Sequence, residues 1–196
     1  MRPAQLVTGG RCLPRPRKRL VAPGTDGVSC RRVMTVDDVL SVLTMLRKAD
    51  ADVWIAGGWG IDALLGAQTR PHRDLDLLHR ADQEPRVIEA LSGAGFAETL
   101  DWRPVRFVLA RPTGEEIDFH PLAFAPDGSA LQSSLDPEKP YVYPAECFTT
   151  GTIGGTTVRC ISAGQQVLFH QGYEPADRDR HDMAMLREKF GITTHF

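Results

Sequence analysis

From Thr35 onward, apolar residues recur at spacings that alternate between those of helices and those of strands. The segment "TVDDVLSVLTMLRKAD" carries an apolar stripe at helical spacing, made of Val36, Val39, Leu40, Leu43 and Leu46. Thr35 and Asp38 match a capping box, which favours a helix that begins here. The next segment, "DVWIA", is a short apolar run that ends at Gly57-Gly58 and predicts a buried strand. "WGIDALLG" then predicts a short helix that stops near Gly66.

The middle of the chain predicts one more helix and three more strands. "RDLDLLH" alternates polar and apolar residues, which is the pattern of a strand. "PRVIEALSGAGF" predicts a helix with Val87, Ile88 and Leu91 on its inner side. The strands "VRFVLA" and "EEIDFHPLAF" are joined by the turn "RPTGE" and predict a β-hairpin.

The last third of the chain begins with a polar loop, residues 125–140, rich in turn-forming residues. "TTGTIGGTTVRCI" predicts another hairpin around Gly154-Gly155, and Ser162 is a plausible N-cap for a helix in "AGQQVLFHQGY". A final helix, "ADRDRHDMAMLREKFG", is expected to end at Gly191. The order predicts an α+β protein with a mixed β-sheet flanked by helices over 34–125. A smaller C-terminal hairpin and helical part, 126–196, is expected to pack on it as one unit.

The composition is that of a soluble globular protein. Of 196 residues, 42% are hydrophobic and 24% are charged, and no apolar run is long enough to cross a bilayer. The four cysteines form no CxxC pair, so reduced thiols in a cytoplasmic protein are the simplest interpretation. They are Cys12, Cys30, Cys147 and Cys160.

Charge is distributed unevenly along the chain. Residues 1–33 carry eight Lys and Arg residues against one acid, whereas 34–196 carry 15 basic and 24 acidic residues. The basic stretch is typical of a nucleic-acid arm or a targeting segment. It lacks amphipathic periodicity and contains four prolines, so we interpret it as a disordered leader, or an upstream-extended start with Met34 as the first functional residue. The acidic remainder argues against extended contact with nucleic acid.

Two carboxylates, Asp74 and Asp76, are separated by one residue on a predicted strand and therefore share one of its faces. Two such charges repel each other unless a cation lies between them. Mg²⁺ prefers carboxylate oxygens together with substrate phosphates. Glu116, Asp118 and His120 likewise share one face of a strand, and Asp118 would be a third carboxylate of the cluster if that strand lies beside "RDLDLL".

The Gly57-Gly58 pair complements this cluster. Glycine permits a tight turn from strand to helix and lets backbone N–H groups approach an anion. The N-terminus of the following helix is itself an anion site. A phosphate-binding turn that faces a metal-binding carboxylate cluster is typical of a nucleotide site, although neither a P-loop nor a GxGxxG motif is present.

These motifs, in this order, resemble a known family. "GGWGIDALLGAQTRPHRDLDLL" is similar to the nucleotidyltransferase signature of the DNA polymerase β superfamily, and especially to its antibiotic-resistance branch, the aminoglycoside 2″-adenylyltransferases and lincosamide nucleotidyltransferases. The lincosamide side is nearer, because "EIDFH", "YPAE", "GTIGGTTVRCIS", "FHQGYE" and "KFGI" also match. The resemblance covers about Val36 to Ile192.

The resemblance implies the polymerase β-like nucleotidyltransferase fold and transfer of a nucleoside monophosphate from an NTP to a hydroxyl of a small antibiotic, with release of pyrophosphate. AMP from ATP is expected, with two Mg²⁺ ions. Asp74 and Asp76 match the paired metal ligands, and Asp118 matches the third carboxylate, which can bind metal and accept the proton of the attacking hydroxyl. Gly57 and Gly58 match the turn that holds the triphosphate.

Basic residues near these motifs are further candidates. Arg70, His72 and Arg73 could meet phosphates or the nucleotide, with a solvated basic loop as the alternative. Arg178, Arg180 and His181 could reach the triphosphate from the last helix, although a charged helix face explains them without a ligand. His170 is interpreted as a core or interface histidine, and Glu115 and Glu116 as surface charge.

Four aromatic residues could wall an acceptor pocket, with ordinary core packing as the alternative: Trp59, Trp102, Tyr141 and Tyr143. Two other functions remain open: a nucleotidyltransferase that acts on RNA or protein, and a non-catalytic nucleotide-binding regulator. Retention of all three aspartates argues against a silent site. The sequence leaves the acceptor, the base of the NTP and the oligomeric state undetermined.

Overall fold

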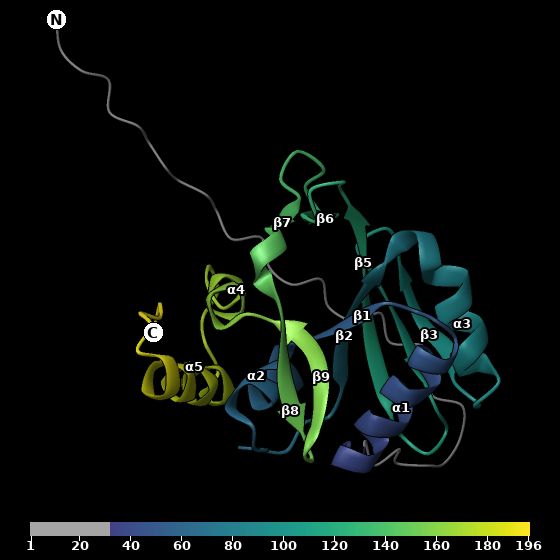
Figure 1. Cartoon of the computed structure of the whole chain (residues 1–196), viewed down its shortest axis with the longest axis horizontal. Helices are drawn as coiled ribbons and strands as arrows, with labels where there is room; N and C mark the ends of the chain where they lie inside the picture. Colours follow the sequence, from purple (N-terminus) through teal and green to yellow (C-terminus); the bar gives the residue numbers. More distant parts are fainter. Residues whose placement is uncertain (1–31) are drawn as a thin grey trace, which may run out of the picture.

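The computed structural model describes residues 32–196, which fold around a single mixed sheet of nine strands (Figure 1). Seven strands form the main path in the order β3-β4-β5-β2-β1-β9-β8. In chain order they are β1 (Val53–Ala56), β2 (Leu75–Arg80), β3 (Ala97–Trp102), β4 (Arg106–Ala110), β5 (Glu116–Phe124), β8 (Phe148–Ile153) and β9 (Thr156–Ile161). Strands β2 and β5 run parallel, as do β1 and β9, and the other neighbours on this path are antiparallel.

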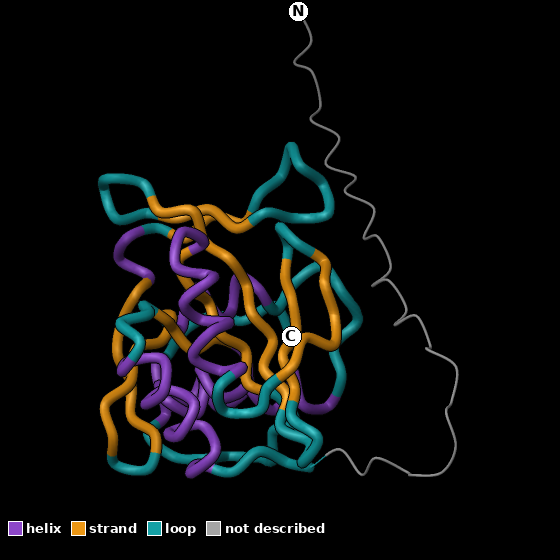
Figure 2. Tube along the Cα trace, turned by 90° about the vertical axis from the view of Figure 1, so that its right-hand side faces the viewer, coloured by secondary structure: helices purple, strands orange, loops and turns teal. Residues whose placement is uncertain are grey.

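Two short strands extend the sheet at one end. Strand β6 (Ala130–Gln132) pairs with the end of β5, and β7 (Tyr141–Tyr143) pairs with β6. In Figures 1 and 2 this pair lies across the top of the molecule. Strands β6 and β7 therefore form a rim above the end of β5.

Five α-helices cover the sheet: α1 (Val36–Lys48), α2 (Gly57–Leu65), α3 (Glu84–Ser92), α4 (Ala163–Phe169) and α5 (Asp177–Phe190). Of two 3₁₀ turns, η1 (Ala81–Gln83) connects β2 to α3, and η2 (Ala145–Cys147) connects β7 to β8. The predicted capping box of α1 is confirmed, because Thr35 and Asp38 bond reciprocally. Ser162 caps α4, and Gly66 and Gly191 end α2 and α5 in the left-handed conformation.

Strand alternation divides the buried residues between the two faces of the sheet. The main core joins one face to α1 and α3, which pack against each other (Figure 1). Leu75 and Leu77 of β2 and Phe119 of β5 belong to this core. A second cluster on the other face includes Leu78 and Tyr143. Asp76, which lies between Leu75 and Leu77 in sequence, must therefore point to the second face.

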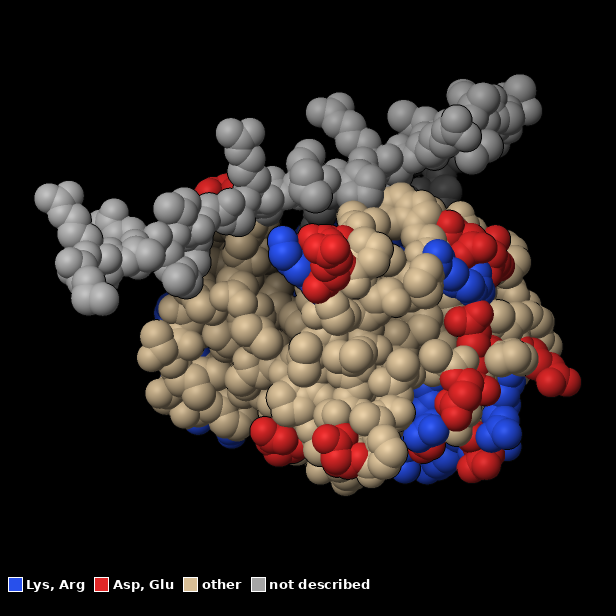
Figure 3. Space-filling view, turned by 90° about the horizontal axis from the view of Figure 1, so that it is seen from above, with Lys and Arg blue, Asp and Glu red and all other residues tan. Residues whose placement is uncertain are grey.

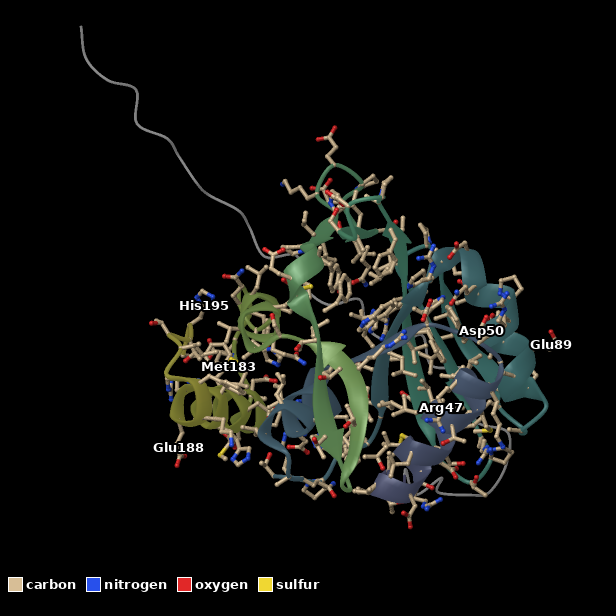
Figure 4. All side chains as sticks on the ribbon, viewed as in Figure 1. Arg47, Asp50, Glu89, Met183, Glu188 and His195 are labelled. Atoms are coloured by element: carbon tan, nitrogen blue, oxygen red, sulfur yellow. The ribbon has the colours of Figure 1, made fainter. Side chains whose placement is uncertain are left out.

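The C-terminal helices attach through a third cluster between α2, α4 and α5. Ile61 of α2, Val167 of α4 and Met183 of α5 meet there. Figure 4 shows Met183 directed from α5 toward the body of the protein and Glu188 directed away from it. The described residues contain no helix that is both long and apolar enough to cross a membrane.

The structure differs from the sequence prediction at three strands. Strands β3 and β7 were not predicted, and β6 lies inside the segment predicted as a loop. Strand β3 lies at an edge of the sheet and has no buried residue, so its sequence lacks the alternation of a half-buried strand. Strands β6 and β7 have three residues each, too short to show a period.

Most of the predicted leader lies outside the described residues, but its last two residues are described. Arg32 forms ion pairs with Asp38 and Glu115, each at 3.0 Å. Met34 is buried, and its N–H donates to the carbonyl of His72. The interpretation of Glu115 as surface charge is wrong: its side chain is only 6% exposed and also accepts a hydrogen bond from Thr113.

Candidate active site

Asp76 and Asp118 lie side by side on neighbouring parallel strands, β2 and β5. Their backbones are paired in register, and strand alternation turns both side chains away from the main core. The conditional prediction that β5 lies beside β2 is therefore confirmed. Asp74 precedes the first residue of β2 and is exposed, so it lies at the open end of the cluster rather than within the strand.

Asp118 is the most enclosed carboxylate of the cluster. Its side chain is 10% exposed, and one oxygen, Oδ2, is ion-paired with Arg106 of β4. The other, Oδ1, is buried and has no hydrogen-bond partner. Burial raises the pKa of Asp118 to about 6, and the charges of Asp76 and Asp74 act in the same direction.

His120 completes the cluster on the same face of β5. Its Nε2 lies 3.6 Å from Oδ1 of Asp76 and 3.8 Å from Oδ1 of Asp118. Burial alone would lower the pKa of His120, but the two carboxylates outweigh it and raise this pKa. For Asp76 burial is likewise outweighed: His120, Arg106 and His170 hold its pKa below the usual value.

The Gly57-Gly58 turn lies against this cluster. Gly57 has φ +58°, and a Cβ at this position would lie 2.1 Å from Oδ2 of Asp76. A Cβ on Gly58 would lie 2.3 Å from Nδ1 of His72. Both positions therefore require glycine, the first also because of its positive φ. Helix α2 begins at Gly57 without a side-chain cap and without an acidic residue in its first turn, which leaves its N–H groups available to an anion.

A buried hydrogen-bond network holds the loop between α2 and the carboxylates. Asp62, only 2% exposed, accepts hydrogen bonds from the backbone N–H and hydroxyl of Thr69 at 3.0 and 2.7 Å. Its second oxygen pairs with Nε2 of buried His72. Asp62 and His72 thus fix the chain that leads into Asp74 and Asp76. This partnership makes His72 a structural residue rather than a free phosphate ligand.

Arg70, a predicted nucleotide-binding residue, lies beside the glycine turn and already has a partner. Its Nε and Nη2 donate to both oxygens of buried Asp182 on α5, at 2.8 and 2.6 Å. A Cβ on Gly58 would lie 2.7 Å from Nη2. Arg70 therefore ties α5 to the turn. Arg73 is exposed in the loop just before Asp74.

Helix α4 braces the site from the C-terminal part of the chain. Gln166, 1% exposed, donates to the carbonyl of Gly57 at 3.4 Å, and Gln165 donates to the carbonyl of Val142 on β7 at 2.9 Å. His170 bonds through Nδ1 to the carbonyl of Gln166 at 2.7 Å. The interpretation of His170 as a packing residue agrees with this contact, although its charge also acts on Asp76.

The aromatic candidates separate into two groups. Trp59 is 1% exposed and packs against the ring of His72, so of the two alternatives core packing applies to it. Tyr143 is also buried and donates its hydroxyl hydrogen to Gln132. Trp102 lies 5.0 Å from the guanidinium carbon of Arg106, and Tyr141 is 47% exposed at the rim.

The basic residues of α5 are distributed over its surface. Arg178 and Arg180 pair with nearby acids, Asp179 and Glu174, at 3.8 and 3.4 Å. These contacts match the interpretation of a charged helix face. Viewed from above, the charges of the α3 and β3 side are also mixed in sign (Figure 3). There Arg103 forms ion pairs with three acids, Glu84, Glu98 and Asp101.

The residues present fit a hard divalent cation. Ligand atoms of Asp76, Asp118 and His120 all lie within 4.8 Å of one another. The buried, unpartnered Oδ1 of Asp118 supplies a second and independent indication, because a buried carboxylate oxygen without a partner is costly. Carboxylate oxygens are the preferred ligands of Mg²⁺.

Sequence reasoning missed three residues that shape the site. Arg106 and Gln132 are far from the motifs along the chain and meet Asp118 and His120 only through the pairing of β4 and β6 with β5. Asp62 carried a recognisable signal, an acid inside the otherwise apolar "WGIDALL". A buried charge needs a partner, and His72 is that partner.

Comparison with known proteins agrees with this geometry. A family described as aminoglycoside-2''-adenylyltransferase matches residues 38–186. A lincosamide resistance protein from Staphylococcus haemolyticus is 30% identical over 154 residues, which is 79% of this chain and 95% of that protein. A 2''-aminoglycoside nucleotidyltransferase from Escherichia coli is 32% identical over 123 residues, 62% of this chain and 64% of that protein.

Solved structures give the same relationship. The lincomycin-bound crystal structure of lincosamide antibiotic adenylyltransferase LnuA matches with a TM-score of 0.73 and 31% identity, over 80% of this chain and 98% of that one. ANT(2")-Ia in complex with adenylyl-2"-tobramycin matches with a TM-score of 0.63 and 21% identity, over 80% of this chain and 89% of that one. The second match supports the fold alone. The chain has the polymerase β-like nucleotidyltransferase fold, belongs to the aminoglycoside-2''-adenylyltransferase family, and is a nucleotidyltransferase.

Proposed function

We propose that this enzyme transfers AMP from ATP to a hydroxyl group of a small antibiotic in a Mg²⁺-dependent reaction, with a lincosamide preferred over an aminoglycoside. The observation that carries the proposal is the in-register pair Asp76 and Asp118 beside Gly57, with Oδ1 of Asp118 buried and unpartnered. The preference for a lincosamide rests on coverage: the match spans 95% of the lincosamide resistance protein but 64% of the aminoglycoside enzyme.

Asp74, Asp76 and Asp118 are the residues that would hold the metal, expected as two ions. When bound, Mg²⁺ would neutralise charge at the α-phosphate and make the attacking hydroxyl more acidic. Asp76 is suited to this role, because its pKa lies below the usual value and it is ionised at neutral pH. Asp74, at the open end of the cluster, would bind on the side of incoming nucleotide.

Asp118 is also the proposed general base. The hydroxyl oxygen of the acceptor attacks the α-phosphorus, its proton passes to the carboxylate of Asp118, and the bond from the α-phosphorus to the bridging oxygen breaks to release pyrophosphate. An ordinary carboxylate is a weak base at neutral pH. In the metal-free protein burial raises the pKa of Asp118 to about 6, so this carboxylate accepts a proton more readily than an ordinary one while remaining mostly ionised at pH 7. Bound Mg²⁺ would lower this pKa.

The backbone N–H groups at Gly57 and Gly58 are the proposed binding site for the triphosphate. They begin a helix whose N-terminus favours negative charge. Arg73 is exposed beside the cluster and can approach phosphate oxygens, whereas Arg70 would act mainly by holding the turn through Asp182. Positioning and electrostatics would then supply most of the rate enhancement.

The test is direct. The full chain is incubated with Mg²⁺, each of the four NTPs in turn, and a panel of lincosamides and aminoglycosides, and the products are examined by mass spectrometry. The proposal predicts a lincosamide adduct heavier by one AMP residue, with stoichiometric pyrophosphate, that disappears with EDTA or in the Asp118→Asn variant. An adduct on RNA or protein instead, or a nucleotide-dependent rise in Tm without pyrophosphate, would support the alternative functions.

A further inference from the structure

His120 can act toward the carboxylate cluster in one of two ways. If Nε2 has a lone pair, the imidazole is a third metal ligand. If Nε2 carries a hydrogen, the ring is a donor that faces Asp76 and Asp118 and cannot ligate a metal. The distances of 3.6 and 3.8 Å from Nε2 to the two carboxylates are compatible with both. The decision lies at the other ring nitrogen, Nδ1.

The side-chain amide of Gln132 contacts this nitrogen. Its Nε2 lies 3.1 Å from Nδ1 of His120 and 3.2 Å from the carbonyl oxygen of Val105. Its Oε1 accepts the hydroxyl hydrogen of Tyr143 at 2.7 Å. A backbone carbonyl can only accept, so the amide nitrogen must be the atom that faces Val105. The second amide hydrogen then points at Nδ1 of His120, which must accept it.

The side-chain amide of Gln132 cannot be flipped without losing hydrogen bonds. Gln132 is 6% exposed and Tyr143 is 2% exposed, so water does not replace lost partners. A flip would place Oε1 against the carbonyl oxygen of Val105 and leave two acceptors facing each other. The chain therefore holds Nδ1 as an acceptor and puts the hydrogen of the neutral ring on Nε2. An imidazolium ring would also carry a hydrogen on Nε2, but its Nδ1–H would then face the amide N–H of Gln132, so Gln132 opposes the rise in the pKa of His120 that the two carboxylates cause.

We propose that Gln132, supported by Tyr143, makes His120 a positioning residue with an Nε2–H directed at Asp76 and Asp118, and thereby keeps the metal site all-oxygen. This inference rests on the proposed function, because it concerns the metal that the nucleotidyl transfer uses. An imidazole ligand would favour Zn²⁺ and similar ions, whereas carboxylates and water suit Mg²⁺ and Mn²⁺. Residues of β6 and β7 would thus select the hard cation.

The tautomer is measurable in the metal-free full chain. In ¹⁵N-histidine-labelled protein, long-range ¹H–¹⁵N spectra distinguish a protonated ring nitrogen from one with a lone pair. The expected result is a hydrogen on Nε2 of His120, both before and after addition of Mg²⁺. A lone pair on Nε2 in either state overturns the proposal. This readout needs no activity, so a failure of nucleotidyl transfer and a failure of this inference are distinguishable.

Two substitutions extend the test to the metal. Gln132→Glu replaces the donor to Nδ1 by an acceptor, which holds a hydrogen on Nδ1 and allows a metal ion to displace the hydrogen on Nε2. Gln132→Met, of similar length, removes the donor without adding an acceptor or a charge. Bound Mn²⁺ is examined by pulsed EPR, which detects a directly coordinated imidazole nitrogen, and the ratio of Zn²⁺ to Mn²⁺ affinity is measured by competition.

We expect no nitrogen coupling in the wild-type protein and a clear coupling in Gln132→Glu, together with at least a tenfold rise in the Zn²⁺ to Mn²⁺ ratio. The Zn²⁺ to Mn²⁺ affinity ratio of Gln132→Met should lie between those of the other two proteins. The ratio is used because an added negative charge would strengthen the binding of both metals. Nitrogen coupling in the wild type, or the same ratio in all three proteins, contradicts the proposal. If Gln132→Glu does not fold, the wild-type spectra and Gln132→Met decide.

Discussion

Arg106 of β4 is ion-paired with Asp118 of β5, across two strands whose side chains share the face of the carboxylate cluster. The guanidinium also lies 5.0 Å from the ring of Trp102. Its positive charge lowers the pKa of Asp118 and so opposes the effect of burial. Together with His120, Arg106 therefore lowers the pH at which the proposed base becomes ionised.

Arg106→Gln should move the activity profile to higher pH. Without the guanidinium, the pKa of Asp118 rises further above its value of about 6, so a larger fraction of the carboxyl is protonated near neutrality. If the pKa rises by about one, kcat/KM should fall about threefold at pH 6.5 and very little at pH 8.5, in proportion to the ionised fraction. Arg106→Lys keeps the charge and is the control. A uniform loss at every pH would mean that Arg106 acts on substrate binding instead.

Asp118→Asn should abolish transfer without unfolding the protein. Loss of a charge that acts in the transition state costs about 10² to 10³ in kcat, and here the metal ligand and the base are lost together. Folding stability should not fall in parallel. The folded-state pKa of about 6 lies above the ordinary value of 3.8, so the ionised carboxylate destabilises the fold above pH 6.

The two properties of Asp118→Asn are measured separately. Turnover is followed by pyrophosphate release, and stability at pH 7.5 by urea unfolding, where the variant should be at least as stable as the wild type. Glu116→Gln, on the same strand face at the far end from His120, is the matched control. Turnover of Asp118→Asn within a factor of ten of the wild type would remove the proposed role.

Gly57→Ala should inactivate the enzyme, whereas Gly66→Ala should not. Both glycines have positive φ, +58° and +79°, so an alanine strains the backbone at each, by about 1 kcal/mol. Only at Gly57 would the new Cβ also collide with the carboxylate of Asp76, at 2.1 Å; at Gly66 nothing lies within 4 Å. The matched pair therefore separates backbone strain from displacement of Asp76. Comparable Tm values with unequal kcat support this; equal activity in both variants contradicts it.

The sequence predicted the cluster because strand alternation is a local property. Asp76 and Asp118 could each be assigned a strand face from neighbouring leucine and phenylalanine residues, and only the adjacency of β2 and β5 had to be supplied by the structure. Arg106 and Gln132 could not be assigned, because their roles depend on which strands pair and in which register. The two alternatives for Trp59 stayed open because proximity to the glycine turn in sequence does not show which side of α2 faces the core.

His79 gives a prediction about acid stability. Its side chain is fully buried and edge-on to the rings of Phe107 and Phe119. Neither ring nitrogen has a hydrogen-bond partner, and Nε2 lies 3.6 Å from Oε2 of Glu84. Burial lowers the pKa of His79 to about 4, and the charges of His120 and Arg103 act in the same direction.

The direction in which stability changes with pH follows from the linkage between protonation and folding. The unfolded chain takes up a proton on this histidine near pH 6.5, but the folded protein does so only near pH 4. As the pH falls through this window the unfolded state binds more protons, so the free energy of unfolding decreases, by about 3 kcal/mol in all. His79→Leu removes the titration. Between pH 7 and pH 4 the free energy of unfolding of the variant should therefore decrease by about 3 kcal/mol less than that of the wild type.

Urea unfolding at half-unit steps of pH measures both curves, and the comparison of slopes cancels the constant cost of changing the core. Phe119→Leu, in contact with the same ring, is the control: it should lower the free energy of unfolding at every pH and leave the difference between pH 7 and pH 4 unchanged. Parallel curves for the wild type and His79→Leu would show that the buried imidazole does not limit acid stability. The burial of His79 predicts that the two curves diverge below pH 6.5 and that the free energy of unfolding of the variant depends less on pH.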